Sequence, residues 1–291
     1  MVIATGFFDG VHLGHRFILR QLVEEARRRN DESMVVTFWP HPRNVLQDDA
    51  RNLRLLTSME EKKALIRSIG VDHIEVIPFT KEFCRLSAEE YLRDYIVGKF
   101  GGKAILVGYD NRIGSDQTAE IARRLGLDAI RPERFVSDNG IVISSTKIRN
   151  LLQAGEIEEA DSMLGYQYQL YGVVVSGNRL GHTIGFPTAN MQLYEPLKLI
   201  PGNGVYLVKV ETLGRVYDGM CNIGVRPTLG SGNALTVETN IFDFNEDIYG
   251  LDIRISFVSK IRNEVKFNDF SVLASQLEKD RAHCRILLRE K

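Results

Sequence analysis

The chain has 291 residues, 44% hydrophobic and 26% charged, values typical of a globular protein with a real core. Its 37 Lys and Arg residues nearly balance 38 Asp and Glu residues, which argues against recruitment of nucleic acid or an anionic membrane by overall charge. The 3 cysteines are odd in number and far apart, so we expect reduced thiols. No segment is long enough to span a membrane, and the start lacks a basic leader. We therefore expect a cytoplasmic protein without a membrane or nucleic-acid partner.

Strand-like and helix-like segments alternate in the first half. The predicted strands are residues 1–7, 34–39, 73–79 and 103–109. The predicted helices are residues 16–29, 60–69, 91–100, 119–127 and 144–155. Such alternation predicts a Rossmann-like α/β domain, in which helices cover both faces of a parallel sheet and ligands bind at the carboxyl ends of the strands.

Two of these helices have a capping-box spacing at their start. Thr57 precedes Glu60 by three residues, and Ser87 precedes Glu90 by the same interval. A Ser or Thr side chain at the first position accepts from the main chain, and the acidic side chain reaches back. We therefore predict Thr57 and Ser87 as N-caps.

Beyond Gly165 the pattern becomes rich in β-strands. Apolar runs broken by Gly, Pro and Asn occupy residues 168–177, 204–212, 216–224, 235–244 and 251–261. A single long helix is expected at residues 270–288. This pattern predicts a small antiparallel β-barrel with a terminal helix. We place the domains at 1–160 and 161–291.

The stretch GFFDGVHLGH, Gly6–His15, joins the first strand to the first helix. Main-chain N–H groups at a helix start lack helical partners, and the helix dipole favours an anion there. His12 and His15 can donate hydrogen bonds to phosphate oxygens as charge develops on them. Three glycines would let a polyphosphate approach the backbone closely: Gly6, Gly10 and Gly14.

Two other interpretations of the histidine pair stay open at this point. The pair could share a metal ion, although the Glu of an HExxH motif is missing and no third ligand is evident nearby. Either histidine could also be a structural residue of a turn.

The stretch ISSTKIR, residues 143–149, has the composition of a second phosphate site. Ser144, Ser145 and Thr146 supply hydroxyls at a helix start, and Lys147 and Arg149 follow in its first turns. Hydroxyls, free N–H groups and a guanidinium together can hold a triphosphate. Plain N-capping is the alternative. Taken together, the two stretches favour a nucleotide site that is not a P-loop, since no Walker A sequence occurs.

With these motifs the chain resembles the nucleotidyltransferase superfamily, marked by HxGH and ISSTxxR-type motifs. The stretch TFWPHPRNVL, residues 37–46, narrows the resemblance to bacterial bifunctional riboflavin kinase/FMN adenylyltransferases, also called FAD synthetases. The resemblance implies flavin contacts at Pro40 and Pro42. The ATP-binding residues that it implies for adenylyl transfer are Gly6, Phe7, Phe8, Asp9, Gly10, Gly14, Asp110, Ser144, Ser145, Thr146 and Arg149.

The second half matches the same family. GFPTAN, residues 185–190, resembles the PTAN signature of riboflavin kinases. Thr188 and Asn190 lie on one side of an extended segment, and their oxygens suit Mg²⁺ held jointly with ATP phosphates. By the resemblance, Gly185 and Pro187 complete this ATP/Mg²⁺ segment.

Two further segments carry the resemblance into the kinase half. VETNIFDFNEDIYG, residues 237–250, makes Glu238 the candidate general base, and IRNEVKF, residues 261–267, implies flavin contacts near Arg262. Without the family, Glu238 could be an exposed strand residue and Thr-Ala-Asn a turn.

The resemblance implies a two-step synthesis of FAD. The barrel would phosphorylate riboflavin with MgATP to give FMN. The N-terminal domain would then join FMN to the adenylyl group of a second ATP and release pyrophosphate, with His12 and His15 stabilising the transition state. Two alternatives stay open: an FMN adenylyltransferase with a weakly active kinase domain, and a non-catalytic flavin-binding protein.

The chain departs from the family pattern at four places. Asn111 and Ile113 replace the aromatic residues of a GxDFxFG stretch, although Asp110 and Arg112 remain. His182 replaces the usual arginine before PTAN, and Asn240 replaces the usual histidine after Glu238. The first strand also begins at the first residue, without the customary lead. These departures bear on substrate affinity and on which activities are retained.

Overall fold

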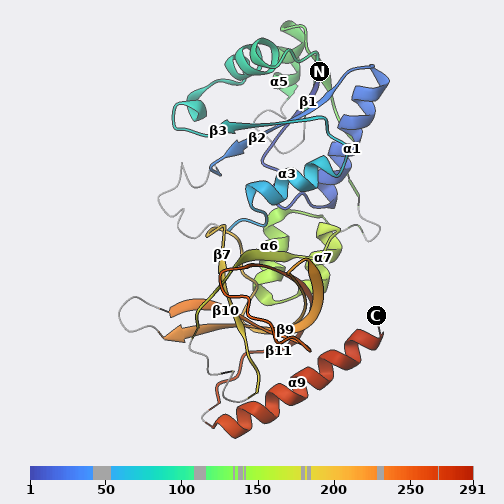
Figure 1. Cartoon of the computed structure of the whole chain (residues 1–291). Coiled ribbons are helices and arrows are strands. Elements are labelled where there is room, and N and C mark those ends of the chain that lie inside the picture. The colour runs from blue at the N-terminus through green and yellow to red at the C-terminus, as the bar shows by residue number, and fades with distance from the viewer. Residues whose placement is uncertain are drawn as a thin grey trace. The chain divides into compact units, whose positions relative to one another are not determined.

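The computed structural model describes residues 1–41, 54–107, 116–133, 135–136, 140, 142–177, 181, 185–227, 233–267 and 269–290. Its contacts divide the chain into two units, Met1–Ser145 and Thr146–Lys291, which are described separately (Figure 1). The boundary expected after residue 160 stays a prediction. The predicted residues that lie outside the described ones are Pro42, Asp110, Asn111, Arg112, Ile113 and His182.

The first unit is built on a five-stranded sheet in the order β3-β2-β1-β4-β5, with every pair parallel. Its strands are β1 Val2–Thr5, β2 Ser33–Trp39, β3 His73–Pro78, β4 Ala104–Leu106 and β5 Asp128–Ile130. The strand order reverses direction at β1, between β2 and β4. Ligands of such sheets bind outside the carboxyl ends at this switch point, which is where the segment after β1 begins.

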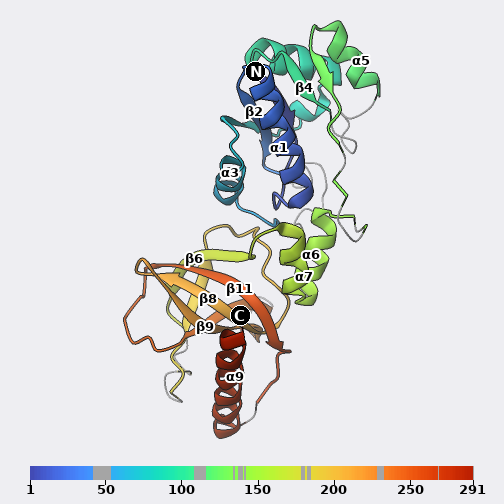
Figure 2. The same ribbon diagram turned by 90° about the vertical axis from the view of Figure 1, so that its right-hand side faces the viewer.

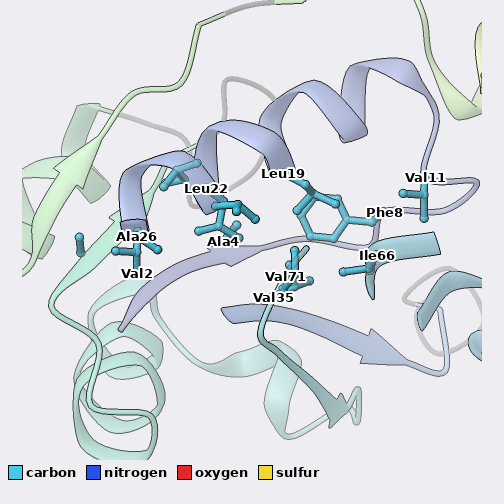
Figure 3. Close-up of a cluster of buried hydrophobic side chains, with 13 residues drawn as sticks. Val2, Ala4, Phe8, Val11, Leu19, Leu22, Ala26, Val35, Ile66 and Val71 are labelled. Carbon is cyan, nitrogen blue, oxygen red and sulfur yellow. The ribbon is translucent and has the colours of Figure 1, made fainter. Parts of the chain in front are cut away.

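Helices cover both faces of this sheet. They are α1 Leu13–Arg28, α3 Met59–Arg67, α4 Ala88–Glu90, α5 Asp116–Arg124, the short 3-10 helix η2 Phe83–Arg85 and η3 Tyr91–Lys99, a π-helix. On one face, Leu19 and Leu22 of α1 pack with Val2 and Ala4 of β1 (Figure 3). Because both faces are buried, the central strands are apolar at consecutive positions and not at alternate ones.

The opposite face has its own core. Leu92 and Ile96 of η3 pack against Ile3, Val36 and Ile105 of the sheet. An aromatic cluster extends this core: Phe7, Phe38, Phe79, Phe83, Tyr91 and Tyr95. The predicted parallel α/β domain is therefore confirmed.

The predicted cap of α3 was wrong by one residue. Ser58 is the N-cap, and it forms a full capping box with Glu61. The Thr57 hydroxyl is used instead in a contact with Asp9, far away in sequence. The capping box of Ser87 and Glu90 is confirmed.

Helix α6, Ser145–Ala154, begins at the boundary of the two units, and the second unit continues through helix α7, Ile157–Leu164, into a closed barrel. The barrel order is β10-β7-β6-β11-β8-β9, with antiparallel neighbours. Its strands are β6 Gln169–Val175, β7 Ala189–Leu193, β8 Gly204–Thr212, β9 Arg215–Pro227, β10 Asn233–Ile241 and β11 Asp252–Arg262. The predicted barrel is confirmed, and β7, expected only as an extended segment, is one of its strands.

The terminal helix α9, Phe270–Glu290, runs along the outside of this barrel (Figure 2). Its Cys284 is fully buried and belongs to the same cluster as Leu207, Met220 and Val258 of the strands. The strand residues on the other side of the wall fill the barrel, as Tyr206 and Phe257 do with ring centroids 5.3 Å apart. The barrel wall is therefore packed on its inner face and, beneath α9, on its outer face.

Candidate active sites

The segment after β1 has a strained backbone. Phe8, Gly10 and Val11 have φ angles of +48°, +80° and +38°. A β-branched residue such as Val11 is an outlier in this region, and a strained non-glycine residue costs about 1–3 kcal/mol. Such a conformation persists only where neighbouring contacts fix it.

Asp9 supplies these contacts. Its carboxylate, only 4% exposed, accepts from the Leu56 N–H at 3.1 Å and from the Thr57 N–H at 3.2 Å and hydroxyl at 3.3 Å. The Gly10 N–H donates to the Thr57 hydroxyl at 3.2 Å, and the Ser145 hydroxyl donates to the Asp9 carbonyl at 2.9 Å. The side chain of Asp9 therefore shapes the loop by binding the start of α3.

His12 and His15 meet at the start of α1. His12 is the N-cap, and its Nδ1 accepts from the His15 N–H at 3.3 Å. The two rings stack with centroids 3.6 Å apart. Because Nδ1 of His12 is an acceptor, the proton of the neutral ring lies on Nε2 and can be donated to a ligand.

The surroundings of His15 keep its ring neutral. The Phe8 ring stands edge-on at 5.4 Å, and Nδ1 of His15 is buried without a hydrogen-bond partner in the described part of the chain. Burial lowers the pKa of His15 well below its ordinary value, and the nearby His12 and Lys62 lower it further. The pair is therefore suited to donating hydrogen bonds to an anion without carrying two charges.

The remaining residues predicted for this site are two glycines beside the aromatic rings, Phe7, and residues at the start of α6 and after β2. A Cβ atom at Gly14 would lie 3.3 Å from the His12 ring, and one at Gly6 would lie 3.1 Å from the Phe8 ring, so glycine leaves room for both rings. Phe7 packs on Phe38. Ser144 precedes α6, Thr146 and Arg149 lie on α6, and Pro40 follows β2.

The second candidate site lies on the barrel wall. Glu238 of β10 stands directly opposite Asn190 of β7 on one side and Asn222 of β9 on the other. Directly opposite residues of antiparallel strands project to the same face. The carboxylate is therefore flanked by two amides, and Asn222 is a neighbour that the sequence patterns did not single out.

Asn240, one of the departures from the family pattern, has a definite partner. Its side-chain amide is 7% exposed and donates to the Pro187 carbonyl at 2.7 Å. The segment that carries Thr188 and Asn190 is therefore held against β10 by this residue. Gly185 starts the segment with a φ of +79°, a conformation that glycine adopts without strain.

A pocket of about 360 Å³ opens beside Thr188. Its apolar part includes Val174, Ile241 and Ile248, and its polar part includes Glu246 and Asp247. An apolar cavity with a few polar groups at its rim is typical of a small-molecule site.

Arg262 is engaged by the terminal helix. Its guanidinium donates to both carboxylate oxygens of Asp280, to Oδ1 at 3.0 Å and to Oδ2 at 2.8 Å, and to the Asn263 carbonyl at 3.0 Å. Asp280 is only 3% exposed, and Gln276 also donates to it. The orientation of the predicted flavin residue is thus fixed by α9.

The donor set near Glu238 suits a hard cation shared with a phosphate ligand. Thr188 and Asn190 offer a hydroxyl and an amide oxygen, and a Cβ atom at Gly177 would lie 2.3 Å from the Asn190 amide, so Gly177 leaves the space that this amide fills. No group of three or more His, Cys, Asp or Glu side chains that could hold a metal exists among the described residues.

Comparison with known proteins gives a consistent result over both units. A family model described as FAD synthetase matches residues 1–147, and one described as riboflavin kinase matches residues 164–288. The bifunctional riboflavin kinase/FMN adenylyltransferase of Listeria monocytogenes is 37% identical over 291 residues, 98% of this chain and 91% of that protein. The enzyme of the same name from Bacillus subtilis is 36% identical, over 96% of this chain and 90% of that protein. The chain belongs to the bifunctional riboflavin kinase/FMN adenylyltransferase family.

A solved structure agrees with this family fold. A Streptococcus pneumoniae chain described as a macrolide-efflux protein has a TM-score of 0.87 and 33% identity, covering 98% of this chain and 93% of that one. Among the described helices of our chain, none is long and apolar enough to cross a membrane. The two family models leave residues 148–163 unassigned, so they do not test the boundary predicted at 160.

Proposed function

We propose that the protein makes FAD from riboflavin in two ATP-dependent steps, with FMN as the intermediate. The observation that carries this proposal is the match of both family models in one chain, each over the unit that holds the corresponding motif. Riboflavin, FMN and ATP are then its small-molecule partners. We place the enzyme in the cytoplasm.

In the kinase step, Glu238 accepts the proton of the terminal ribityl hydroxyl of riboflavin. The hydroxyl oxygen attacks the γ-phosphorus of ATP, the bond to the β–γ bridging oxygen breaks, and ADP leaves. The amides of Asn190 and Asn222 on either side of Glu238 support this role, because they can orient a carboxylate without neutralising it.

Thr188 and Asn190 would hold Mg²⁺ together with the ATP phosphates. When bound, the cation neutralises charge on the β- and γ-phosphate oxygens. The pocket beside Thr188 would take the adenine of the same ATP, because its apolar wall suits a flat base. Pro187 and Gly185 fix the backbone conformation of the segment that leads into Thr188 and Asn190.

In the adenylyl transfer step, a phosphate oxygen of FMN attacks the α-phosphorus of ATP. The bond to the α–β bridging oxygen breaks, and pyrophosphate leaves. Nε2–H of His12 and the neutral ring of His15 donate to the phosphate oxygens on which charge grows. No protein nucleophile is needed, because positioning and charge stabilisation supply the rate.

The other motif residues have supporting roles in this proposal. Gly6, Gly10 and Gly14 let ATP approach the loop, and Asp9 holds the shape of that loop. The hydroxyls and the guanidinium of the ISSTKIR motif bind the triphosphate, on the strength of the family motif: Ser144, Ser145, Thr146 and Arg149.

The flavin would contact Pro40 in the adenylyltransferase unit and the region of Arg262 in the kinase unit. The pairing of Arg262 with Asp280 supports a fixed position for that arginine. An adenylyltransferase with an inactive kinase unit is not favoured, because the face with Glu238 and Asn190 is intact and Asn240 makes a specific contact.

A product analysis tests the proposed function. The full chain is incubated with riboflavin, MgATP and excess ATP, and the three flavins are separated by chromatography. We expect FMN and then FAD, and direct FAD formation when FMN is supplied. Riboflavin that stays unconverted while supplied FMN becomes FAD would limit the activity to the second step.

A further inference from the structure

Lys62 of α3 is a buried cation that the motifs did not identify. Its side chain is 5% exposed, and it precedes the buried Ile66 by one helical turn, on the face that packs inward. In the part of the chain that the structure describes, no hydrogen bond or ion pair reaches its ammonium, and the ammonium is not among the fully buried atoms that lack a partner, so it keeps some exposure. Its neighbour Lys63 is partly exposed and pairs with Glu60 at 3.1 Å.

Lys62 lies within electrostatic range of the histidine loop. Its charge lowers the pKa of His15, and the carboxylate of Asp9 acts on Lys62 in turn. The start of α3 is tied to the same loop through the bonds from Leu56 and Thr57 to Asp9. The start of the helix that carries Lys62 is therefore fixed against the histidine loop.

A lysine that is buried over most of its side chain, with no direct partner for its ammonium, is costly. The effective desolvation penalty of a buried ion is several kcal/mol, and only a close counter-charge repays it. The carboxylate of Asp9 offsets this penalty only in part. It forms no direct ion pair with Lys62, and its oxygens already accept hydrogen bonds from three groups of Leu56 and Thr57. Burial accordingly lowers the pKa of Lys62 more than Asp9 raises it.

We propose that Lys62 binds a substrate phosphate beside His15 during adenylyl transfer. This inference rests on the proposed function of that site. Both substrates of the step, ATP and FMN, carry phosphate groups, and either would supply the negative charge that the ammonium lacks. The experiment separates the two sources.

Steady-state kinetics of FAD formation from supplied FMN test the proposal, with ATP and FMN varied separately. The variants are Lys62→Met, Lys62→Arg and the matched control Lys63→Met on the same helix. We expect Lys62→Met to lower kcat/KM by about 10- to 100-fold, the effect of losing one charge-assisted hydrogen bond. The substrate whose KM rises is the one whose phosphate binds Lys62.

The controls separate phosphate binding from charge balance. Lys62→Arg keeps the charge and recovers most of the loss, Lys63→Met matches the wild type, and riboflavin phosphorylation is unchanged in all three. Wild-type kcat/KM in Lys62→Met, with only a lower unfolding temperature, would overturn the proposal and leave Lys62 as a counter-charge for Asp9. If Lys62→Met does not unfold cooperatively, Lys62→Gln replaces it with the same expected loss.

Failure of the proposed function gives a different result. A wild type that forms no FAD from FMN and ATP would contradict the function, and Lys62 is then tested by calorimetric titration with inorganic pyrophosphate. Binding about tenfold weaker in Lys62→Met than in the wild type supports the phosphate site. Equal binding in the two proteins overturns it.

Discussion

At the scale of single residues, the departures from a family motif need not be losses. Asn240 replaces a histidine, yet its amide donates to the Pro187 carbonyl at 2.7 Å from a position that is 7% exposed. An imidazole N–H can make the same kind of bond, so we expect a histidine to be able to replace Asn240 here. The function of this position is therefore to hold the segment that carries Thr188 and Asn190.

We predict that Asn240→Ala raises the KM for ATP in riboflavin phosphorylation by about 3- to 10-fold, since one hydrogen bond contributes about 1 kcal/mol. Initial-rate measurements check this. Asn240→His should stay close to the wild type, and FAD formation from FMN should not change in either variant. An Asn240→Ala protein with unaltered phosphorylation kinetics would show that the bond does not position the segment.

His15 predicts a pH dependence of stability. Its folded pKa lies well below the value of about 6.5 expected for the unfolded chain. Above that pH His15 is neutral in both the folded and the unfolded state, and its contribution to the free energy of unfolding is fully present. As the pH falls below about 6.5, His15 binds a proton in the unfolded chain but stays neutral in the folded one. The free energy of unfolding therefore drops by up to about 1.4 kcal/mol per pH unit until the pKa of His15 in the folded state is reached.

Urea unfolding of the wild type and of His15→Asn between pH 8 and 5 checks this sign. The wild type should lose more stability than the variant on acidification. A difference between the two proteins that is constant over this range would mean that His15 titrates alike in both states.

At the scale of elements, helix α9 is fastened to the barrel by a buried ion pair. Arg262 and Asp280 have side chains that are 20% and 3% exposed, and the guanidinium bonds both carboxylate oxygens. Removing one partner leaves an uncompensated charge, whereas an exposed pair on the same helix contributes little. Glu278 and Arg281 form such an exposed pair, at 56% and 35% exposure.

We expect Asp280→Asn to reduce the free energy of unfolding of the kinase unit by roughly 3 kcal/mol. Glu278→Gln, the matched control, should change it by less than about 1 kcal/mol. Chemical denaturation followed by a probe in the barrel measures both. Similar losses in the two variants would indicate that the helix as a whole, and not this pair, sets the stability.

The elements themselves could largely be predicted from the sequence, because hydrophobic periodicity and capping residues act locally. The cap of α3 was ambiguous, because both Thr57–Glu60 and Ser58–Glu61 have the capping-box spacing, and the choice depends on the bond of Thr57 to Asp9, which lies 48 residues away in the chain. The strand β7 was expected only as an extended segment, because its polar start does not indicate a strand until β10 pairs with Ala189 and Asn190 and β6 pairs with residues 190–193. Lys62 left a readable signal, a lysine on the buried face of an amphipathic helix.

At the scale of the whole molecule, the chain has two separately packed units and two candidate sites, one at the histidine loop and one on the barrel wall. The histidine loop depends on contacts within Met1–Ser145, and the face with Glu238 depends on strands within Thr146–Lys291. The family match spans both units, as does the similarity to the relatives. The central claim is that the two reactions use different residues and can be removed one at a time.

The most direct test is a product analysis of His12→Ala and Glu238→Gln, each given riboflavin with MgATP and, separately, FMN with MgATP. We predict that His12→Ala accumulates FMN and forms FAD about 10²–10³ times more slowly. Glu238→Gln should form FMN about 10²–10⁴ times more slowly and still convert supplied FMN to FAD at the wild-type rate. Loss of both reactions in either folded variant would contradict the account.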